Sequence, residues 1–171
     1  MNMKIKAPAI KLGNNIDTDV ILPGQYMTLV DPYELAKHAL SGLDLAFPEK
    51  AKKGVIVVGG KNFGCGSSRE QAPLALKYAG VKCVLAESFA RIFYRNAINV
   101  GLLPVVCPQA GAILEGTEVM VDLDGGYLVN EGKKLPIEPI PEFLRKIIDA
   151  GGLVEFAREV REVPVCTGSQ P

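Results

Sequence analysis

GVIVVGGKNFGCGSSRE, residues 54–70, joins an apolar run to a polar, glycine-rich loop. Its first part is a run of β-branched residues between glycines, which is typical of a strand buried on both faces. The second part interrupts this run with glycines, two hydroxyls and a guanidinium. Packing a core does not require that mixture, so the loop is the first candidate for a functional site.

Outward from this loop, strands and helices alternate. They are expected in the order strand, helix, strand, helix, strand at residues 55–58, 69–78, 81–86, 89–100 and 102–107. Glycines directly after the apolar pattern stop both helices. This order predicts a parallel βαβαβ unit with right-handed crossovers, in which ligands bind at the carboxyl ends of the strands.

The flanking segments have other periodicities. Residues 117–130 have the turn chemistry of an antiparallel hairpin. Helical patterns occur at residues 32–40, 140–150 and 154–162. The length of 171 residues suits one domain. We expect a single α/β domain over residues 1–171, with its core at 5–160 and a loose tail at 167–171.

Composition disfavours several classes of protein. Lys plus Arg and Asp plus Glu both total 19, without runs of like charge, so we expect no nucleic-acid partner. The sequence has no apolar leader and no apolar stretch of about 18 residues, so we expect no membrane partner and a cytoplasmic location. The cysteines are too widely spaced for a structural zinc site, and we expect free thiols and no metal bound by this chain. They are Cys65, Cys83, Cys107 and Cys166.

The loop at residues 60–70 has two interpretations. The pairs Ser67–Glu70 and Ser68–Gln71 both match a capping box, in which side chains satisfy the free amides at a helix start. That motif leaves Arg69 unexplained, because a cation in the first turn is unfavourable against the helix dipole. A negative ligand in front of the helix would make this position of Arg69 favourable, since glycines, free N–H groups and a two-pronged guanidinium together bind a carboxylate.

Three other features leave alternatives open. Asp17 and Asp19 point the same way in an extended chain, and they suit acid/base work or a metal as well as turn and capping roles. A single-chain hydrolase with a Ser-His-Asp triad is disfavoured, because the sole histidine, His38, is expected on an exposed helix. Cys65, between two glycines, is either a reactive thiol or a space-filling residue.

Four motifs in order resemble the swivel domain of the aconitase superfamily. They are NIDTDVI at 15–21, GCGSSRE at 64–70, AESFARIFYRN at 86–96 and GLLP at 101–104. As a stand-alone chain, the sequence is similar to the small subunits of the isopropylmalate isomerase branch. The resemblance implies a swivelling β/β/α domain of the aconitase type, with a central parallel βαβαβ unit plus antiparallel strands.

The resemblance also implies a division of labour between two chains. A large subunit would carry a 4Fe-4S cluster, and this chain would bind no cofactor. By correspondence of motifs, Ser67 would be the base that removes a proton beside a carboxylate. The substrate ligands would be Gly66, Ser68, Arg69, Asp17 and Asp19. The implied reaction is a hydro-lyase step of leucine biosynthesis that interconverts 2- and 3-isopropylmalate through 2-isopropylmaleate, only in the presence of the large subunit.

Substrate choice in this family depends on the segment after the Asp-Thr-Asp motif. Here the segment consists of Tyr26, Met27, Thr28, Leu29 and Val30. A neutral, partly apolar loop favours an aliphatic substituent, because an extra substrate carboxylate would be costly to bury unpaired. The segment departs from the Tyr-Leu-Val-x-Thr form of the family. Homoaconitase, citramalate and dimethylmalate dehydratases therefore remain alternatives, as does an anion-binding module without chemistry.

Overall fold

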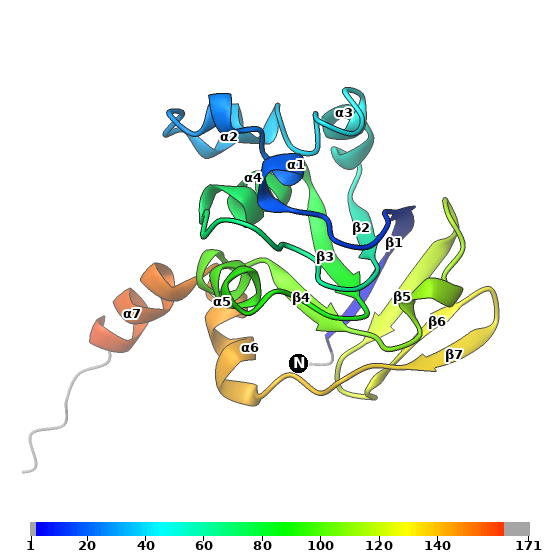
Figure 1. The fold of residues 1–171 in the computed structure, drawn as a ribbon. Helices are drawn as coiled ribbons and strands as arrows, with labels where there is room; N and C mark the ends of the chain where they lie inside the picture. The colour runs from blue at the N-terminus through cyan, green and yellow to red at the C-terminus, as the bar shows by residue number, and fades with distance from the viewer. Residues whose placement is uncertain (1–2, 163–171) are drawn as a thin grey trace, which may run out of the picture.

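The computed structural model describes residues 3–162, and the tail expected at 167–171 lies outside them. The described residues form one seven-stranded sheet in the order β4-β3-β2-β1-β5-β6-β7 (Figure 1). The strands are β1 (Lys4–Lys11), β2 (Val55–Gly59), β3 (Val81–Ala86), β4 (Leu103–Val106), β5 (Glu118–Asp122), β6 (Tyr127–Asn130) and β7 (Lys133–Pro136). The helices are α1 (Thr18–Ile21), η1 (Gly24–Tyr26), α2 (Pro32–Ala36), α3 (Phe47–Ala51), α4 (Gln71–Ala79), α5 (Arg91–Val100), η2 (Ala110–Ala112), α6 (Glu142–Asp149) and α7 (Leu153–Glu162).

The parallel βαβαβ unit is confirmed. Strands β2, β3 and β4 pair in parallel, and α4 and α5 connect them. Both helices begin two residues later than the sequence pattern predicts, and both end at a left-handed glycine, Gly80 and Gly101, as predicted. The hairpin is also confirmed, because β5 and β6 pair antiparallel and Gly125 N–H donates to Asp122 Oδ1 across 2.8 Å in the turn.

Strands β1 and β7 were not predicted. In β1, three lysines and Pro8 argue against a central strand, because charged side chains favour an edge and proline cannot donate to a ladder. The structure resolves this conflict by giving β1 different partners along its length. Residues 4–8 pair antiparallel with β5, and residues 9–11 pair parallel with β2. Pro8 therefore lies at the point where pairing with one neighbour gives way to pairing with the other.

Hydrophobic cores lie on both faces of the sheet. In β2, Val55 and Val57 pack into the core under the helices, whereas Ile56 and Val58 pack into the core shared with β5, β6 and β7. This alternation confirms that the β-branched run is buried on both faces.

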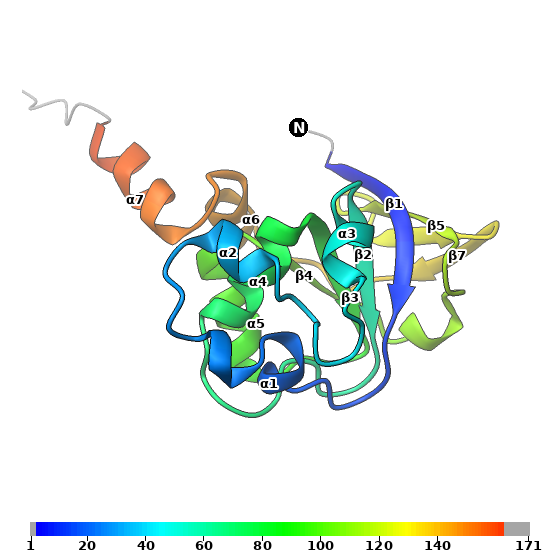
Figure 2. The ribbon, with the colours of Figure 1, turned by 90° about the horizontal axis from the view of Figure 1, so that it is seen from above.

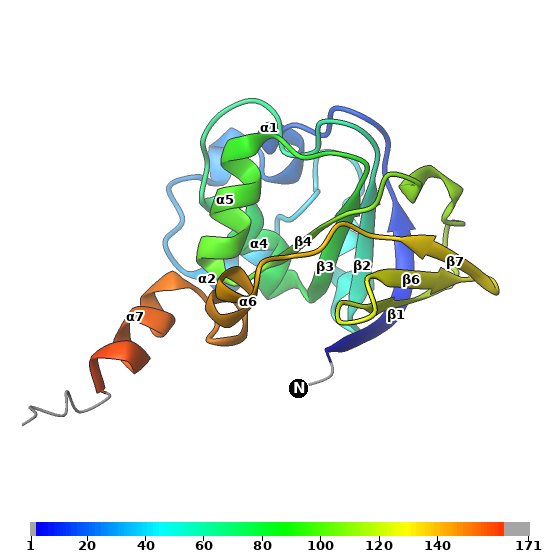
Figure 3. The ribbon, with the colours of Figure 1, turned by 90° about the horizontal axis from the view of Figure 1, so that it is seen from below.

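The loops that leave β1, β2 and β3 gather at one edge of the sheet, next to α1 and the start of α5 (Figures 2 and 3). At the other end of the chain, α7 extends away from the body of the domain (Figure 1). Within residues 3–162, no helix combines the length and apolarity that crossing a bilayer requires.

Candidate active site

Backbone hydrogen bonds join the loop after β1 to the loop after β2. Asn15 N–H donates to Lys61 O across 2.8 Å, and Gly64 N–H donates to Ile16 O across 2.7 Å. Further along, Thr18 N–H donates to the carbonyl of Cys65 across 2.9 Å. The two loops therefore continue the parallel pairing of β1 and β2 beyond the strands. This brings the Asp-Thr-Asp motif under the Gly-Ser-Ser-Arg motif.

The loop after β3 hydrogen-bonds to the other side of the loop after β2. We call these three joined loops, which follow β1, β2 and β3, the platform. Phe63 N–H donates to Ser88 O across 3.0 Å, and Ala90 N–H donates to Phe63 O across 2.9 Å. The Phe63 ring is fully buried and packs edge-to-face on Phe93, with ring centroids 5.3 Å apart. Gly64 crosses this aromatic cluster with φ +81°, and a Cβ there would lie 2.1 Å from Phe93 Cγ. Only glycine fits this position.

Ser67 and Ser68 lie exposed on the platform. The predicted capping box is wrong, because α4 begins at Gln71 and its N-cap, Glu70, makes no side-chain cap hydrogen bond. The backbone between the serines and the helix turns on its own, with Arg69 N–H donating to Ser67 O across 2.9 Å. Neither serine is therefore committed to capping the helix.

Arg69 lies before the N-cap, so its predicted place in the first turn of the helix is also wrong. Its guanidinium Nη1 donates to Asp19 Oδ1 in an ion pair, and the Arg69 side chain is 17% exposed against 62% for Asp19. A Cβ on Gly24 would lie 3.7 Å from both Nη1 and Nη2 of Arg69. The guanidinium is thus held between the loop after β2 and the turn that leads into the predicted specificity loop.

The expectation that Asp17 and Asp19 point the same way is wrong, because the chain turns into α1 between them. Asp17 is the N-cap of α1, and its Oδ1 accepts a hydrogen bond of 2.9 Å from Val20 N–H. Asp19 lies in the first turn of α1 and pairs with Arg69. Asp17 therefore has a capping role in α1.

The predicted specificity loop, residues 26–30, begins on an aromatic stack. The rings of Tyr26 and His38 lie parallel, 3.6 Å apart at their centroids with an interplanar angle of 6°. His38 is half-buried and follows α2, so its expected place on an exposed helix is wrong. At the far end of the loop, Val30 is 90% exposed.

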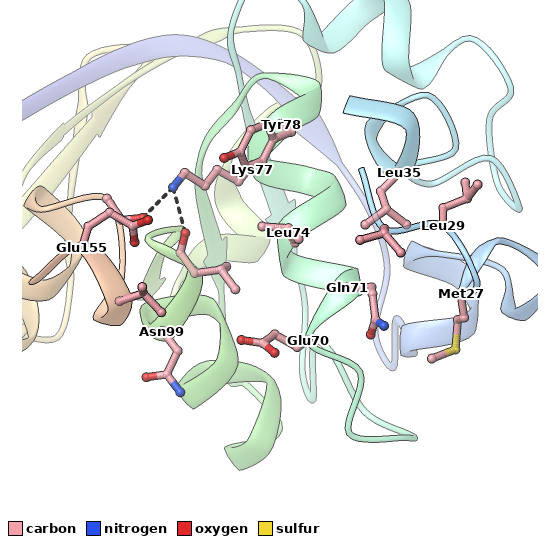
Figure 4. A pocket seen from close by; sticks show the side chains of 14 residues that line it. Met27, Leu29, Leu35, Glu70, Gln71, Leu74, Lys77, Tyr78, Asn99 and Glu155 are labelled. Carbon is pink, nitrogen blue, oxygen red and sulfur yellow. Dashed lines mark hydrogen bonds between the residues drawn. The ribbon is translucent and has the colours of Figure 1, made fainter. Parts of the chain in front are cut away.

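Part of this loop lines a cavity of about 480 Å³ between α4 and α7 (Figure 4). Met27, Leu29 and Leu74 contribute apolar wall. The polar end is formed by Lys77, whose Nζ donates to Val100 O and Gly151 O, each across 2.8 Å, and burial lowers its pKa. Neither Ser67 nor Ser68 lines this cavity, so the hydroxyls lie on open surface beside it.

The thiols differ in their surroundings. Cys83 is fully buried, and burial raises its pKa to about 12. Burial likewise raises the pKa of the Cys107 thiol. Cys65 is half-buried in the loop itself, and Cys166 lies outside the described residues.

The structure brings together Gly66, Ser67, Arg69, Asp17 and Asp19, from two loops about 50 residues apart in sequence. The sequence patterns did not single out Thr18 or the contact of His38 with Tyr26. The sequence did contain a signal for Thr18, because this residue lies between the two aspartates of the Asp-Thr-Asp motif, which resembles a motif of the aconitase superfamily. The stacking of His38 carried none, since it depends on how α2 folds back.

The aconitase C-terminal domain family model matches residues 10–110 of this chain. A protein of Methanopyrus kandleri named 3-isopropylmalate dehydratase small subunit 1 is 53% identical over 94% of this chain and 95% of its own length. A Methanocaldococcus jannaschii protein named methanogen homoaconitase small subunit is 50% identical, covering 92% of this chain and 93% of its own. A crystal structure titled 3-isopropylmalate dehydratase from the same organism is similar with a TM-score of 0.88 and 50% identity, covering 93% of this chain and 96% of that one.

Proposed function

The chain belongs to the aconitase C-terminal domain family, and from that premise we propose that it is the small subunit of a heteromeric 3-isopropylmalate dehydratase. In this role it helps to interconvert 2- and 3-isopropylmalate, through dehydration to 2-isopropylmaleate and rehydration at the adjacent carbon. The chain supplies the base and ligands for the substrate carboxylates, and a large subunit supplies the rest of the site.

The observation that carries this proposal is that Ser67 and Ser68 are exposed in the same loop as Arg69, which pairs with Asp19. An exposed hydroxyl cannot exclude water or hold a substrate from all sides, as a proton transfer beside a carboxylate requires. A second protein surface placed over this edge would close the site. The geometry therefore favours half of an active site over a self-contained hydrolase.

Arg69 binds a substrate carboxylate in this proposal. A guanidinium has five N–H donors, and Asp19 takes one from Nη1. Donors on Nε and Nη2 then suit a two-pronged contact with a carboxylate. Asp19 holds the guanidinium in place, so its function is to orient Arg69, while Asp17 keeps α1 in register beneath the loop.

Ser67 is the proton acceptor in this proposal. A serine hydroxyl is too weak an acid to ionise without nearby positive potential, and Arg69 together with the backbone N–H groups of the loop supplies it. The Ser67 oxygen takes the proton from the carbon beside the carboxylate, and the electron pair of that C–H bond forms the double bond. The hydroxyl group leaves the neighbouring carbon as hydroxide, which takes a proton from the large subunit's side of the site to become water. In the rehydration, Ser67 returns its proton to the carbon that carried the hydroxyl group, and a water that gives a proton back to the large subunit's side adds as hydroxide to the other carbon.

The iron–sulfur cluster belongs to the large subunit in this proposal. Within residues 3–162, no three His, Cys, Asp or Glu side chains gather as metal ligands, and Cys83 and Cys107 are buried in the core. The described part of the chain therefore does not fit a cluster, and the Lewis acid is assigned to the partner.

The specificity loop favours an aliphatic substituent on the substrate. Met27 and Leu29 are half-buried and apolar, and no arginine precedes Arg69 in the sequence. Homoaconitase is the second candidate, because a relative of that name is 50% identical to this chain.

An anaerobic assay of the chain, alone and mixed with its candidate large subunit carrying a reconstituted cluster, tests the proposal. The absorbance of the alkene diacid is followed with isopropylmalate, citramalate and homocitrate. We expect turnover only in the mixture, fastest with isopropylmalate. Turnover by the chain alone would refute the half-site, and a preference for homocitrate would select the second candidate.

A further inference from the structure

Thr18 carries a buried hydroxyl that the proposed chemistry does not use. The residue is 2% exposed. Among the described residues, its Oγ1 is the one buried side-chain oxygen or nitrogen without a hydrogen-bond partner. A buried hydroxyl without a partner destabilises the state in which it occurs, so its position requires an explanation.

The unpaired hydroxyl lies against the glycine loop. A Cβ built on Gly66 would lie 3.4 Å from Thr18 Oγ1 and 3.5 Å from Asp17 Cβ. Gly66 directly precedes Ser67, so the hydroxyl faces the backbone that carries the candidate base. Thr18 N–H already donates to Cys65 O across 2.9 Å, which fixes the position of Thr18 relative to this loop.

We propose that Thr18 is a positioning residue for Ser67, because the Thr18 hydroxyl makes a hydrogen bond to the Gly66–Ser67 backbone only when the loop reaches the arrangement in which Ser67 takes the proton. Gly66, at φ +94°, has the conformational freedom for that adjustment. The hydrogen bond is absent in the free chain and present in the reacting complex. Such a bond favours the reacting arrangement and acts on kcat more than on KM.

The proposal rests on the proposed function, since Ser67 is a base only there. The proposal predicts that removing the Thr18 hydroxyl does not lower the stability of the free chain, whereas a hydroxyl with a purely structural role predicts a loss of stability. Thr18→Val keeps the branched shape and replaces the hydroxyl with a methyl group. If the hydroxyl is unpaired in the free chain, the variant is as stable as the parent or more so, because replacing an unsatisfied polar group with an apolar one removes a desolvation cost. A hydroxyl that supports the fold would instead make Thr18→Val less stable.

Thr117→Val is the matched control. The Thr117 hydroxyl donates to Leu114 O across 2.7 Å and accepts from Asn130 Nδ2 across 2.8 Å, far from the loop in sequence. Its removal breaks two hydrogen bonds and leaves the candidate site untouched. We expect a lower urea midpoint for the isolated Thr117→Val chain and an unchanged kcat in the mixture with the large subunit.

The experiment measures the urea midpoint of each isolated chain, and kcat and KM of each mixture with isopropylmalate. For Thr18→Val we expect a midpoint no lower than that of the parent, a kcat lower by about tenfold, and a KM within about threefold of the parent. Thr18→Ser retains the hydroxyl, and its kcat should return to within about threefold of the parent.

Two outcomes would overturn the proposal. One is a parent-like kcat in Thr18→Val, and the other is a urea midpoint of Thr18→Val below that of the parent, which would show that the hydroxyl supports the fold. Absence of turnover in the parent mixture would refute the proposed function and this proposal with it. Equal turnover in the parent and in Thr18→Val would refute this proposal alone.

Discussion

Gly64→Ala tests the physical account of how the platform is built. A Cβ at this position would lie 2.1 Å from Phe93 Cγ and 2.3 Å from Phe93 Cβ. The ring has little room to retreat, because Phe93 is 2% exposed and packs on Phe63 and Phe89 at centroid distances of 5.3 and 6.2 Å. Either the loop or the aromatic cluster must shift to admit the methyl group.

Two costs add in this variant. Holding an L-residue at φ +81° costs about 1–2 kcal/mol. Forcing a methyl group into a packed core costs about 1–3 kcal/mol. We therefore expect Gly64→Ala to lower the free energy of unfolding by about 2–5 kcal/mol. For a domain of this size, the corresponding loss in Tm is about 4–20 °C.

Gly132→Ala separates the two costs. Gly132 has φ +74°, close to that of Gly64, but nothing lies within 4 Å of the Cβ that it would gain. We expect it to lose only the backbone part, about 1–2 kcal/mol. Urea denaturation of the isolated parent and both variants, read by circular dichroism, measures the difference. If Gly64→Ala loses no more stability than Gly132→Ala, contact with Phe93 does not restrict the loop.

Other variants and one labelling experiment test the site more directly. Ser67→Ala should leave the urea midpoint unchanged and lower kcat of the mixture by several orders of magnitude, because it removes an exposed proton acceptor and no core group; near-normal turnover would exclude Ser67 as the base. Thr28→Arg should raise the preference for homocitrate over isopropylmalate by roughly tenfold or more, whereas the neutral Thr28→Gln should not. Equal homocitrate-to-isopropylmalate rate ratios in the two variants would show that this loop does not select the substrate. Iodoacetamide at pH 8, followed by peptide mass spectrometry, should label Cys65 well before Cys83 or Cys107, because burial raises the pKa of both of these thiols, that of Cys83 to about 12. Early labelling of Cys83 in the folded chain would contradict its burial.

The predictable part of this fold is local in sequence. The β-branched run, the glycines that stop α4 and α5, and the Asp-Gly-Gly turn each act within a few residues, so the parallel unit and the hairpin follow from the sequence. Strand β1 was missed because its pattern is weak. Its pairing depends on two partners that lie far away in the chain.

From the sequence alone, the Gly-Ser-Ser-Arg loop was placed at the carboxyl end of a parallel strand, where ligands bind. The Asp-Thr-Asp motif was assigned to the same site only through the resemblance of motifs, because β1 was not predicted. The contacts that each side chain makes there became visible only in the folded chain. Arg69 pairs with Asp19 across 50 residues of sequence, and Thr18 Oγ1 is left unpaired beneath Gly66. These contacts depend on the crossing of two loops whose register is fixed by distant backbone hydrogen bonds, and no local pattern of residues specifies that register.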